Sequence, residues 1–276
     1  MTVILLRHGR STSNTAGVLA GRSEGVDLDD KGRDQAAGLI DRIGDLPIRA
    51  LVSSPLLRCR RTVEPLAAAL CLEPIIDERL AEVDYGDWTG RKIAELAGES
   101  LWRVVQAHPS AAVFPGGEGL AHVQARAVAA IREHDRRLAV EHGGERGGDV
   151  LWVACTHGDV IKAVIADAYG MHLDAFQRVT ADPASVSVIR YTELRPFVLH
   201  VNHTGAKLAA ALRAGPPPQD QAKAKTDGES PAGPTEQPTA DAAPTEQPTE
   251  QPTEQPTEQP AAVVPSSDAV VGGSTD

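Results

Sequence analysis

Residues 3–9 read VILLRHG, in which four apolar side chains are followed at once by Arg7, His8 and Gly9. A short apolar run that stops at a glycine is typical of a buried strand. An arginine and a histidine at the end of such a strand need an explanation, because buried charge is costly unless it has a partner. One reading is a short edge strand with Arg7 and His8 as its solvated exit. The other reading is a functional site at the end of the strand.

Residues 151–159 read LWVACTHGD and repeat the pattern, since an apolar run again stops at a His-Gly pair. Either histidine alone would more often be structural. Two strands that both end on His-Gly in one α/β domain would instead place both imidazoles at the same edge of a sheet. We therefore expect His8 and His157 to share one site.

The rest of the chain alternates between the patterns of strands and helices. We expect further strands at 50–53 and 73–76, a strand at 150–155, a closing hairpin of 185–191 and 197–202, and helices at 30–43, 55–70, 91–106, 120–142 and 159–169. Proline is favoured at the first position of a helix, and Pro55 is predicted there. The alternation predicts a three-layer α/β/α sandwich with a mainly parallel sheet, in which ligands bind beyond the carboxyl ends of the strands.

Composition disfavours a nucleic-acid partner. The hydrophobic content of 41% is ordinary for a globular chain of 276 residues, but aromatic side chains make up only 3%. Proteins that bind single-stranded nucleic acid rely on aromatic side chains for base stacking. The core is expected to consist of aliphatic residues, and no nucleic-acid partner is expected.

The net charge is unevenly divided along the chain. Residues 215–276 carry a net charge of -9 of the total of -11, which leaves -2 for residues 1–214. A folded domain is predicted over 1–213, and the Pro/Thr/Glu/Gln-rich repeats that follow predict a disordered tail over 214–276. The alternative for the tail is a proline-rich docking ligand. Because the domain is nearly neutral, any positive site in it must be local.

The spacing of the cysteines, and the lack of a recognisable signal peptide or membrane span, indicate the cellular compartment of the protein. Cys59, Cys71 and Cys155 show no paired spacing, which predicts neither a disulfide framework nor a structural zinc site. No signal peptide is recognisable, and no run approaches the ~18 apolar residues of a membrane span. We expect a cytoplasmic protein with no membrane partner, and the sequence leaves the oligomeric state open.

A third segment adds positive charge near the two histidines. The strand at 50–53 leads through SSPLLRCRRT into a helix, with Arg58 near its first turn. Helix amino-termini favour anions, and a guanidinium can bind an anion with two parallel hydrogen bonds. Arg7, Arg58, His8 and His157 would therefore surround an anion, for which phosphate is the natural candidate.

The segments LLRHGRSTSN, SSPLLRCRRT, LAEVDYGDWTG, FPGGEG and VACTHGDVI occur in this order over residues 1–200. Together they resemble the signature of the histidine phosphatase superfamily, in its phosphoglycerate-mutase-like branch. The resemblance implies a phosphoglycerate-mutase-like fold and a covalent phosphohistidine intermediate on His8. It also implies Glu82 as acid and base, and a phosphate clamp made of Arg7, Arg58, His157, Asn14 and Ser11.

The chemistry of these residue types agrees with the implied roles. A neutral imidazole is nucleophilic near neutral pH, and a labile N–P bond allows one slow displacement to proceed as two faster ones. Guanidinium and imidazole groups can stabilise the charge on the transferred phosphoryl group. No cofactor and no metal are expected, and Asp84 and Asp87 are interpreted as solvated loop residues rather than metal ligands.

The destination of the phosphoryl group separates a hydrolase from a mutase. Mutases of this family carry a long basic insertion where this chain has only residues 91–114, so hydrolysis of a small phosphorylated metabolite is favoured. Arg10, Arg22 and Tyr85 are candidate contacts to the substrate. A phosphomutase, an inactive phosphate-binding scaffold and a Cys155–His157 nucleophile remain as alternatives.

Overall fold

The computed structural model describes residues 1–142 and 149–205 of the chain. In this part, six strands form one sheet in the order β3-β2-β4-β1-β5-β6. The strands β1 to β4 pair in parallel, and β5 and β6 add an antiparallel hairpin beside β1. Their bounds are β1 Thr2–Arg7, β2 Ile48–Ser53, β3 Ile75–Ile76, β4 Leu151–Thr156, β5 Val186–Tyr191 and β6 Pro196–His203. The predicted mainly parallel sheet and its closing hairpin are confirmed, while the predicted tail at 214–276 lies outside the described residues.

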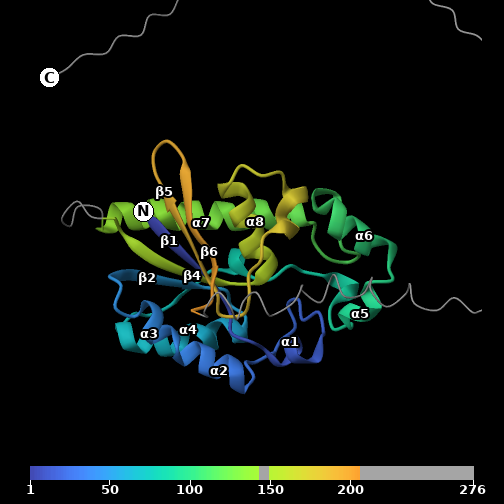
Figure 1. The fold of residues 1–276 in the computed structure, drawn as a ribbon, viewed down its shortest axis with the longest axis horizontal. Coiled ribbons are helices and arrows are strands. Elements are labelled where there is room, and N and C mark those ends of the chain that lie inside the picture. The colour runs from blue at the N-terminus through green and yellow to red at the C-terminus, as the bar shows by residue number, and fades with distance from the viewer. Residues whose placement is uncertain (143–148, 206–276) are drawn as a thin grey trace, which may run out of the picture. The chain divides into compact units, whose positions relative to one another are not determined.

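Helices cover both faces of the sheet (Figure 1). One face carries α2 (Asp30–Ala37), α3 (Leu39–Ile43) and α4 (Leu57–Leu70), and the other carries α7 (Leu120–His142) and α8 (Gly158–Ala168). This arrangement confirms the three-layer sandwich. The shorter elements are α1 (Thr12–Ala16), α5 (Ile93–Leu96), α6 (Ser100–Ala107) and the 3-10 turns η1 Glu78–Leu80, η2 Gly86–Trp88, η3 Pro109–Ala111 and η4 Leu173–Arg178.

The strand β1 lies in the middle of the sheet, between β4 and β5. Its side chains alternate between two separate cores, because successive side chains of a strand point to opposite faces. Val3 and Leu5 pack with the apolar residues of α7 and α8, whereas Ile4 and Leu6 pack with those of α3 and α4. The interpretation of this stretch as an edge strand with a solvated exit is therefore wrong.

Two predicted helices are interrupted. The segment 30–43 divides at Gly38 into α2 and α3, and the segment 91–106 divides into α5 and α6 at residues 97–99, which include Gly98. Glycine weakens a helix interior because it loses the most backbone entropy on folding. The apolar periodicity continues across each break, so the pattern alone suggested single helices.

The helix α4 begins later than predicted. Leu56 is extended, with φ −68° and ψ 137°, and the first helical residue is Leu57. Pro55 therefore stands two residues before the helix instead of opening it. The hydroxyl of Ser54 accepts a hydrogen bond from the Leu56 backbone N–H at 3.3 Å, which satisfies one amide at the start of the helix.

No helix in residues 1–142 and 149–205 is both long enough and apolar enough to cross a membrane.

Candidate active site

The two strand-end histidines lie together. β1 and β4 are neighbours in register, with Arg7 opposite Thr156, so the residues that follow them emerge side by side. The ring centroids of His8 and His157 are 5.2 Å apart. Both rings are buried, with exposed fractions of 3% and 0%. The parallel pairing of two similar strands thus brings together imidazoles that are 149 positions apart in the sequence.

The tautomer of His8 follows from its hydrogen bond. Nδ1 lies 2.7 Å from the carbonyl oxygen of Gly9, and since a carbonyl can only accept, Nδ1 carries the proton. Nε2 then holds the lone pair. Burial lowers the pKa of His8 well below its usual value, and the charges of Arg7 and Arg58 lower it further. His8 is therefore neutral at physiological pH, with Nε2 as a potential nucleophile.

The turn after His8 is held by its backbone. The N–H of His8 donates to the carbonyl of Thr156, and the N–H of Gly9 donates to the hydroxyl of Thr62 on α4 at 2.9 Å. A Cβ on Gly9 would stand 2.7 Å from the carbonyl oxygen of Gly32 in α2. Gly9 is thus required because two backbone segments meet at the turn, and this contact fixes the direction of the His8 ring.

The guanidinium groups of Arg7 and Arg58 line the same cavity as His8, and each has an N–H donor that no described residue accepts. Arg7 Nη1 donates to the carbonyl of Ala181, and Arg58 Nη2 donates to the carbonyl of Gly21 at 2.8 Å. Arg7 Nε and Arg58 Nη1 are buried, and neither has a hydrogen-bond partner in the described part of the chain. Leaving a buried charged donor unsatisfied is costly. The two groups are therefore suited to an anionic ligand.

His157 is held against the start of α4. Its Nε2 lies 2.8 Å from the hydroxyl of Ser54 and 3.5 Å from the thiol of Cys59. Burial lowers the pKa of His157 well below its usual value, with Arg58 adding to the effect, so the ring is neutral. Cys155 was the cysteine suggested as a nucleophile beside His157. Burial raises the pKa of its thiol, which makes it a poor nucleophile.

Glu82 faces this cluster from the loop after η1. Its carboxylate Oε2 is 3.7 Å from His157 Nδ1, and its Oε1 accepts the backbone N–H of Val83 at 3.0 Å. Burial raises the pKa of Glu82 to about 7, and the negative charge of Asp159 contributes to the rise. A carboxyl group with this pKa is present in both protonation states near neutral pH, as an acid–base catalyst requires.

Ser11 and Asn14 line the same cavity and cap α1. The Ser11 hydroxyl accepts from the Asn14 backbone N–H at 3.2 Å, and Asn14 Oδ1 accepts from the Ser11 N–H at 3.0 Å. This reciprocal pair is a capping box, with asparagine in place of the usual acid or glutamine. Ser11 is buried, whereas Asn14 is exposed at the cavity. The cap therefore fixes the position of the Asn14 amide.

These side chains line a cavity of about 390 Å³, which is within the usual size for a small-molecule site. Beyond the arginines, one wall is a chain of polar groups, of which only Tyr85 was predicted from the sequence. The hydroxyl of Tyr85 donates to Asp159 at 2.7 Å, and Lys162 donates to Asp159 at 3.3 Å and to Gln177 at 3.1 Å. Asp159 follows the His-Gly pair directly and could have been found by the strand-end argument, whereas Gln177 carries no local signal.

The two arginines predicted to contact substrate differ in position. Arg10 lines the cavity, and its Nε pairs with Asp29 at 2.5 Å. Arg22 instead lies behind Glu82, where its Nε donates to the Glu82 carbonyl oxygen at 2.9 Å and its Nη2 donates to Glu118 at 2.9 Å. Arg22 thus contacts the backbone of the acid residue in this structure.

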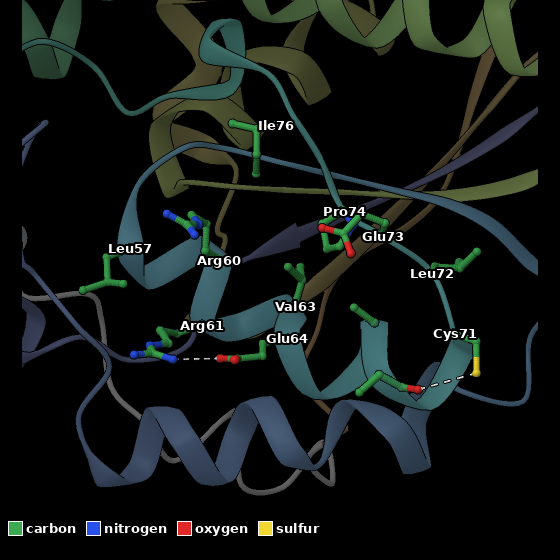
Figure 2. Close-up of a pocket in the computed structure, with 12 residues that line it drawn as sticks. Leu57, Arg60, Arg61, Val63, Glu64, Cys71, Leu72, Glu73, Pro74 and Ile76 are labelled. Atoms are coloured by element: carbon green, nitrogen blue, oxygen red, sulfur yellow. Dashed lines mark hydrogen bonds and ion pairs between the residues drawn. The ribbon is translucent and has the colours of Figure 1, made fainter.

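A second hollow, of about 760 Å³, lies along α4 and the segment that follows it (Figure 2). Arg61 and Glu64 form an ion pair of 3.0 Å at this surface, drawn as a dashed line in Figure 2. Within the described part of the chain, the two hollows share no lining residue, and the larger one is lined by no histidine. The smaller cavity is therefore the one that holds the His8 imidazole and the two guanidinium groups.

Comparisons with known proteins agree with this geometry. A family model described as the histidine phosphatase superfamily (branch 1) matches residues 3–204. Phosphoserine phosphatase 1 of Hydrogenobacter thermophilus is 31% identical over 205 residues, which cover 73% of this chain and 92% of that protein. A probable phosphoglycerate mutase of Erwinia tasmaniensis is 34% identical over 152 residues, 52% of this chain and 70% of that protein. The structure of a mycobacterial glucosyl-3-phosphoglycerate phosphatase matches with a TM-score of 0.67 at 25% identity, covering 73% of this chain and 99% of that one.

Proposed function

The chain belongs to the histidine phosphatase superfamily, and from this premise we propose that it hydrolyses a small phosphomonoester through a phosphohistidine on His8, without a metal. One observation carries the proposal. Two buried guanidinium donors, Arg7 Nε and Arg58 Nη1, have no partner among the described residues, and they adjoin a neutral imidazole with a free Nε2. An anion that satisfies both donors would lie where this lone pair can attack it.

In the first step, His8 Nε2 attacks phosphorus and the bond from phosphorus to the ester oxygen breaks. Arg7, Arg58, His157 and Asn14 donate hydrogen bonds to the other phosphoryl oxygens. Because charge spreads over these oxygens in the transition state, fixed donors in a water-poor site are worth more than in bulk water. Glu82 transfers its proton to the departing oxygen, so that the product leaves as an alcohol.

In the second step, a water molecule replaces the alcohol. Glu82, now a carboxylate, accepts a proton from this water, whose oxygen forms a bond to phosphorus as the N–P bond breaks. Inorganic phosphate is released, and the electron pair of the N–P bond returns to His8 Nε2. The proton from this water returns Glu82 to its neutral form, so the cycle closes with the consumption of one water molecule.

A mutase is the second candidate, supported by the similarity to a probable phosphoglycerate mutase. Phosphoglycerate carries a carboxylate, which needs a cation beyond the phosphate clamp. In the described cavity, Arg10 is paired with Asp29 and Lys162 with Asp159, so both cations there already have an acidic partner. Hydrolysis is therefore favoured. Incubation with 3-phosphoglycerate and catalytic 2,3-bisphosphoglycerate decides the matter, because 2-phosphoglycerate with little free phosphate would establish the mutase.

The proposed function is tested by trapping the intermediate. Rapid quenching during turnover of a phosphomonoester should yield a phosphoryl group on the protein that is labile in acid and stable in base. The variant His8→Ala should lose both this label and phosphate release. A label on serine, aspartate or cysteine would refute the mechanism, and neither label nor phosphate release from a broad panel of monoesters would favour the inactive scaffold.

A further inference from the structure

Glu118 lies at the centre of a hydrogen-bond cluster behind the cavity. Its carboxylate accepts from Arg126 on α7, with Nη2 to Oε1 at 2.7 Å and Nε to Oε2 at 3.1 Å. The carboxylate is mostly buried, with a side-chain exposure of 10%, and so is the guanidinium of Arg126. A buried bidentate pair of this kind has one preferred geometry.

The cluster holds the segment that carries Glu82. Oε1 of Glu118 also accepts the backbone N–H of Asp84 at 3.0 Å. Arg126 Nη2 donates to the carbonyl of Glu82 at 3.2 Å, and Arg22 Nε donates to the same oxygen at 2.9 Å. Both sides of the 82–84 segment are therefore fixed through one carboxylate. Because the Val83 N–H donates to the Glu82 carboxylate, rotation of this peptide would also move the acid group.

The cluster also reaches the phosphate-binding side of the cavity. Arg22 donates to Glu118 at 2.9 Å, and the residue before it, Gly21, accepts a hydrogen bond from Arg58 Nη2 through its carbonyl at 2.8 Å. Two consecutive residues of one loop thus contact the backbone of the acid and the side chain of the clamp. The loop sets the spacing between Arg58 and Glu82.

Glu118 remains charged in this setting. Although burial opposes ionisation, the hydrogen bonds from Arg126 and from the Asp84 N–H hold the pKa of Glu118 below its usual value. The exposed His122 lies 3.3 Å from Oε2 on the outer side. Loss of the charge would weaken three hydrogen bonds at once, since Arg22, Arg126 and the Asp84 N–H all donate to Oε1 of Glu118.

We propose that Glu118, acting through Arg22 and Arg126, is a positioning residue that sets the place of the general acid Glu82 relative to the phosphate clamp. This inference rests on the proposed phosphatase function. Displacement of a catalytic group by about 1 Å can cost on the order of 100-fold in rate. In the first step, which kcat/KM reports, the effect should appear only where the leaving group needs a proton, because an aryl oxide departs without one while an alkoxide does not. The second step uses Glu82 as a base for both esters, so kcat does not separate them.

The test compares Glu118→Gln with the wild type on p-nitrophenyl phosphate and on the best alkyl monoester from a substrate screen. Glutamine keeps the size of the side chain but cannot accept both hydrogen bonds from Arg126. We expect kcat/KM for the alkyl ester to fall roughly 10- to 100-fold, with kcat/KM for the aryl ester changed by less than about threefold. The matched control is Glu141→Gln, which removes an exposed ion pair between Glu141 and Arg137, both on α7. This variant should leave kcat/KM for both esters unchanged.

A double-mutant cycle separates positioning from general damage. If Glu118 acts through Glu82, then adding Glu118→Gln to Glu82→Gln should change kcat/KM for the alkyl ester by less than about threefold. An equal loss of kcat/KM for both esters, or the full loss for the alkyl ester in the Glu82→Gln background, would overturn the inference. Hydrolysis of the aryl ester by the wild type tests the proposed function separately, so the two failures are distinguishable. If Glu118→Gln does not fold, Arg22→Gln, at a partly exposed position, should give the same leaving-group pattern with a smaller loss.

Discussion

At the scale of single residues, one physical effect acts on both proposed catalytic groups, His8 and Glu82. Burial favours the neutral form of any ionisable side chain. For His8 the neutral form is the nucleophile, and its pKa is lowered well below the usual value. For Glu82 the neutral form is the acid, and its pKa is raised to about 7. The same buried surroundings therefore favour the neutral forms in which His8 would act as nucleophile and Glu82 as acid.

The pH dependence of turnover follows from these two shifts. Glu82 of the unliganded protein is protonated below about pH 7 and loses its proton above it, so kcat/KM for an alkyl ester should fall as the pH rises through about 7. His8 stays neutral down to well below its ordinary pKa, so its protonation should not limit the rate near pH 6.5. Glu82→Gln should slow alkyl ester turnover on the order of 10²- to 10⁴-fold and abolish this alkaline fall. Profiles on one substrate remove the effect of substrate ionisation, and an unchanged alkaline fall in the variant would exclude Glu82 as the acid.

Metal independence is a second prediction at this scale. Arg7 and Arg58 supply the fixed positive charge that metal ions supply in many phosphoryl-transfer enzymes. Activity should therefore survive dialysis against EDTA, measured as phosphate release before and after. Arg58→Gln should lower turnover in both samples by the same factor. A strict requirement for added magnesium or manganese would contradict the prediction.

At the scale of elements, the turn that follows His8, at Gly9 and Arg10, depends on close packing against α2. The backbone of Arg10 lies against Gly32 in the first turns of this helix. A Cβ on Gly32 would stand 2.0 Å from the carbonyl oxygen of Arg10, and backbone atoms cannot move aside as a flexible side chain would. The loop that follows His8 can therefore approach the helix only at a glycine.

Gly32→Ala should consequently destabilise the domain by about 1–3 kcal/mol or more, the usual cost of overpacking. The expected fall in Tm is roughly 2–4 °C for each kcal/mol in a domain of this size. Gly38→Ala is the matched control, since its Cβ would be 3.4 Å from the nearest atom and its φ is negative. Thermal unfolding should show no loss for the control, with a gain of up to about 1 kcal/mol. Equal Tm values for the two variants would contradict this account of the turn.

At the scale of the whole molecule, the sheet, both cores and the candidate cavity are described from residues 1–142 and 149–205. Most of the net negative charge lies elsewhere in the sequence, since residues 215–276 contribute -9 of the total of -11. A nearly neutral domain does not repel an anionic substrate as strongly as the overall charge suggests.

A chain that ends after Arg213 should therefore retain its Tm and its turnover of a small phosphomonoester. The physical reason is that the PTEQ repeats contain too little apolar surface to contribute to a core. Thermal unfolding and phosphate release, measured on the full chain and on the truncated chain in parallel, provide the comparison. A large loss of either property would mean that the removed residues contact the domain.

The sequence alone determined the class of fold and the residues at the ends of the strands. Apolar runs, their lengths and the two His-Gly endings are local features, and the physical rules that interpret them act over a few residues. They predicted the parallel sheet, the hairpin and the cluster of Arg7, His8, Arg58 and His157. The sequence rules were wrong where a predicted helix is interrupted, at Gly38 and near Gly98. Apolar periodicity shows which face of a helix is buried, but it does not include the low helix propensity of glycine.

Only the tertiary structure decided how the acid is held. Glu118 and Arg126 meet the segment of Glu82 across 36 and 44 positions of sequence, and Arg22 meets it across 60. No periodicity connects such positions, since their contacts depend on how the loops pack over the ends of the strands. The same is true of the pKa of Glu82, which depends on burial and on Asp159. A residue type states what chemistry is available, whereas the surrounding fold sets its protonation state and its direction.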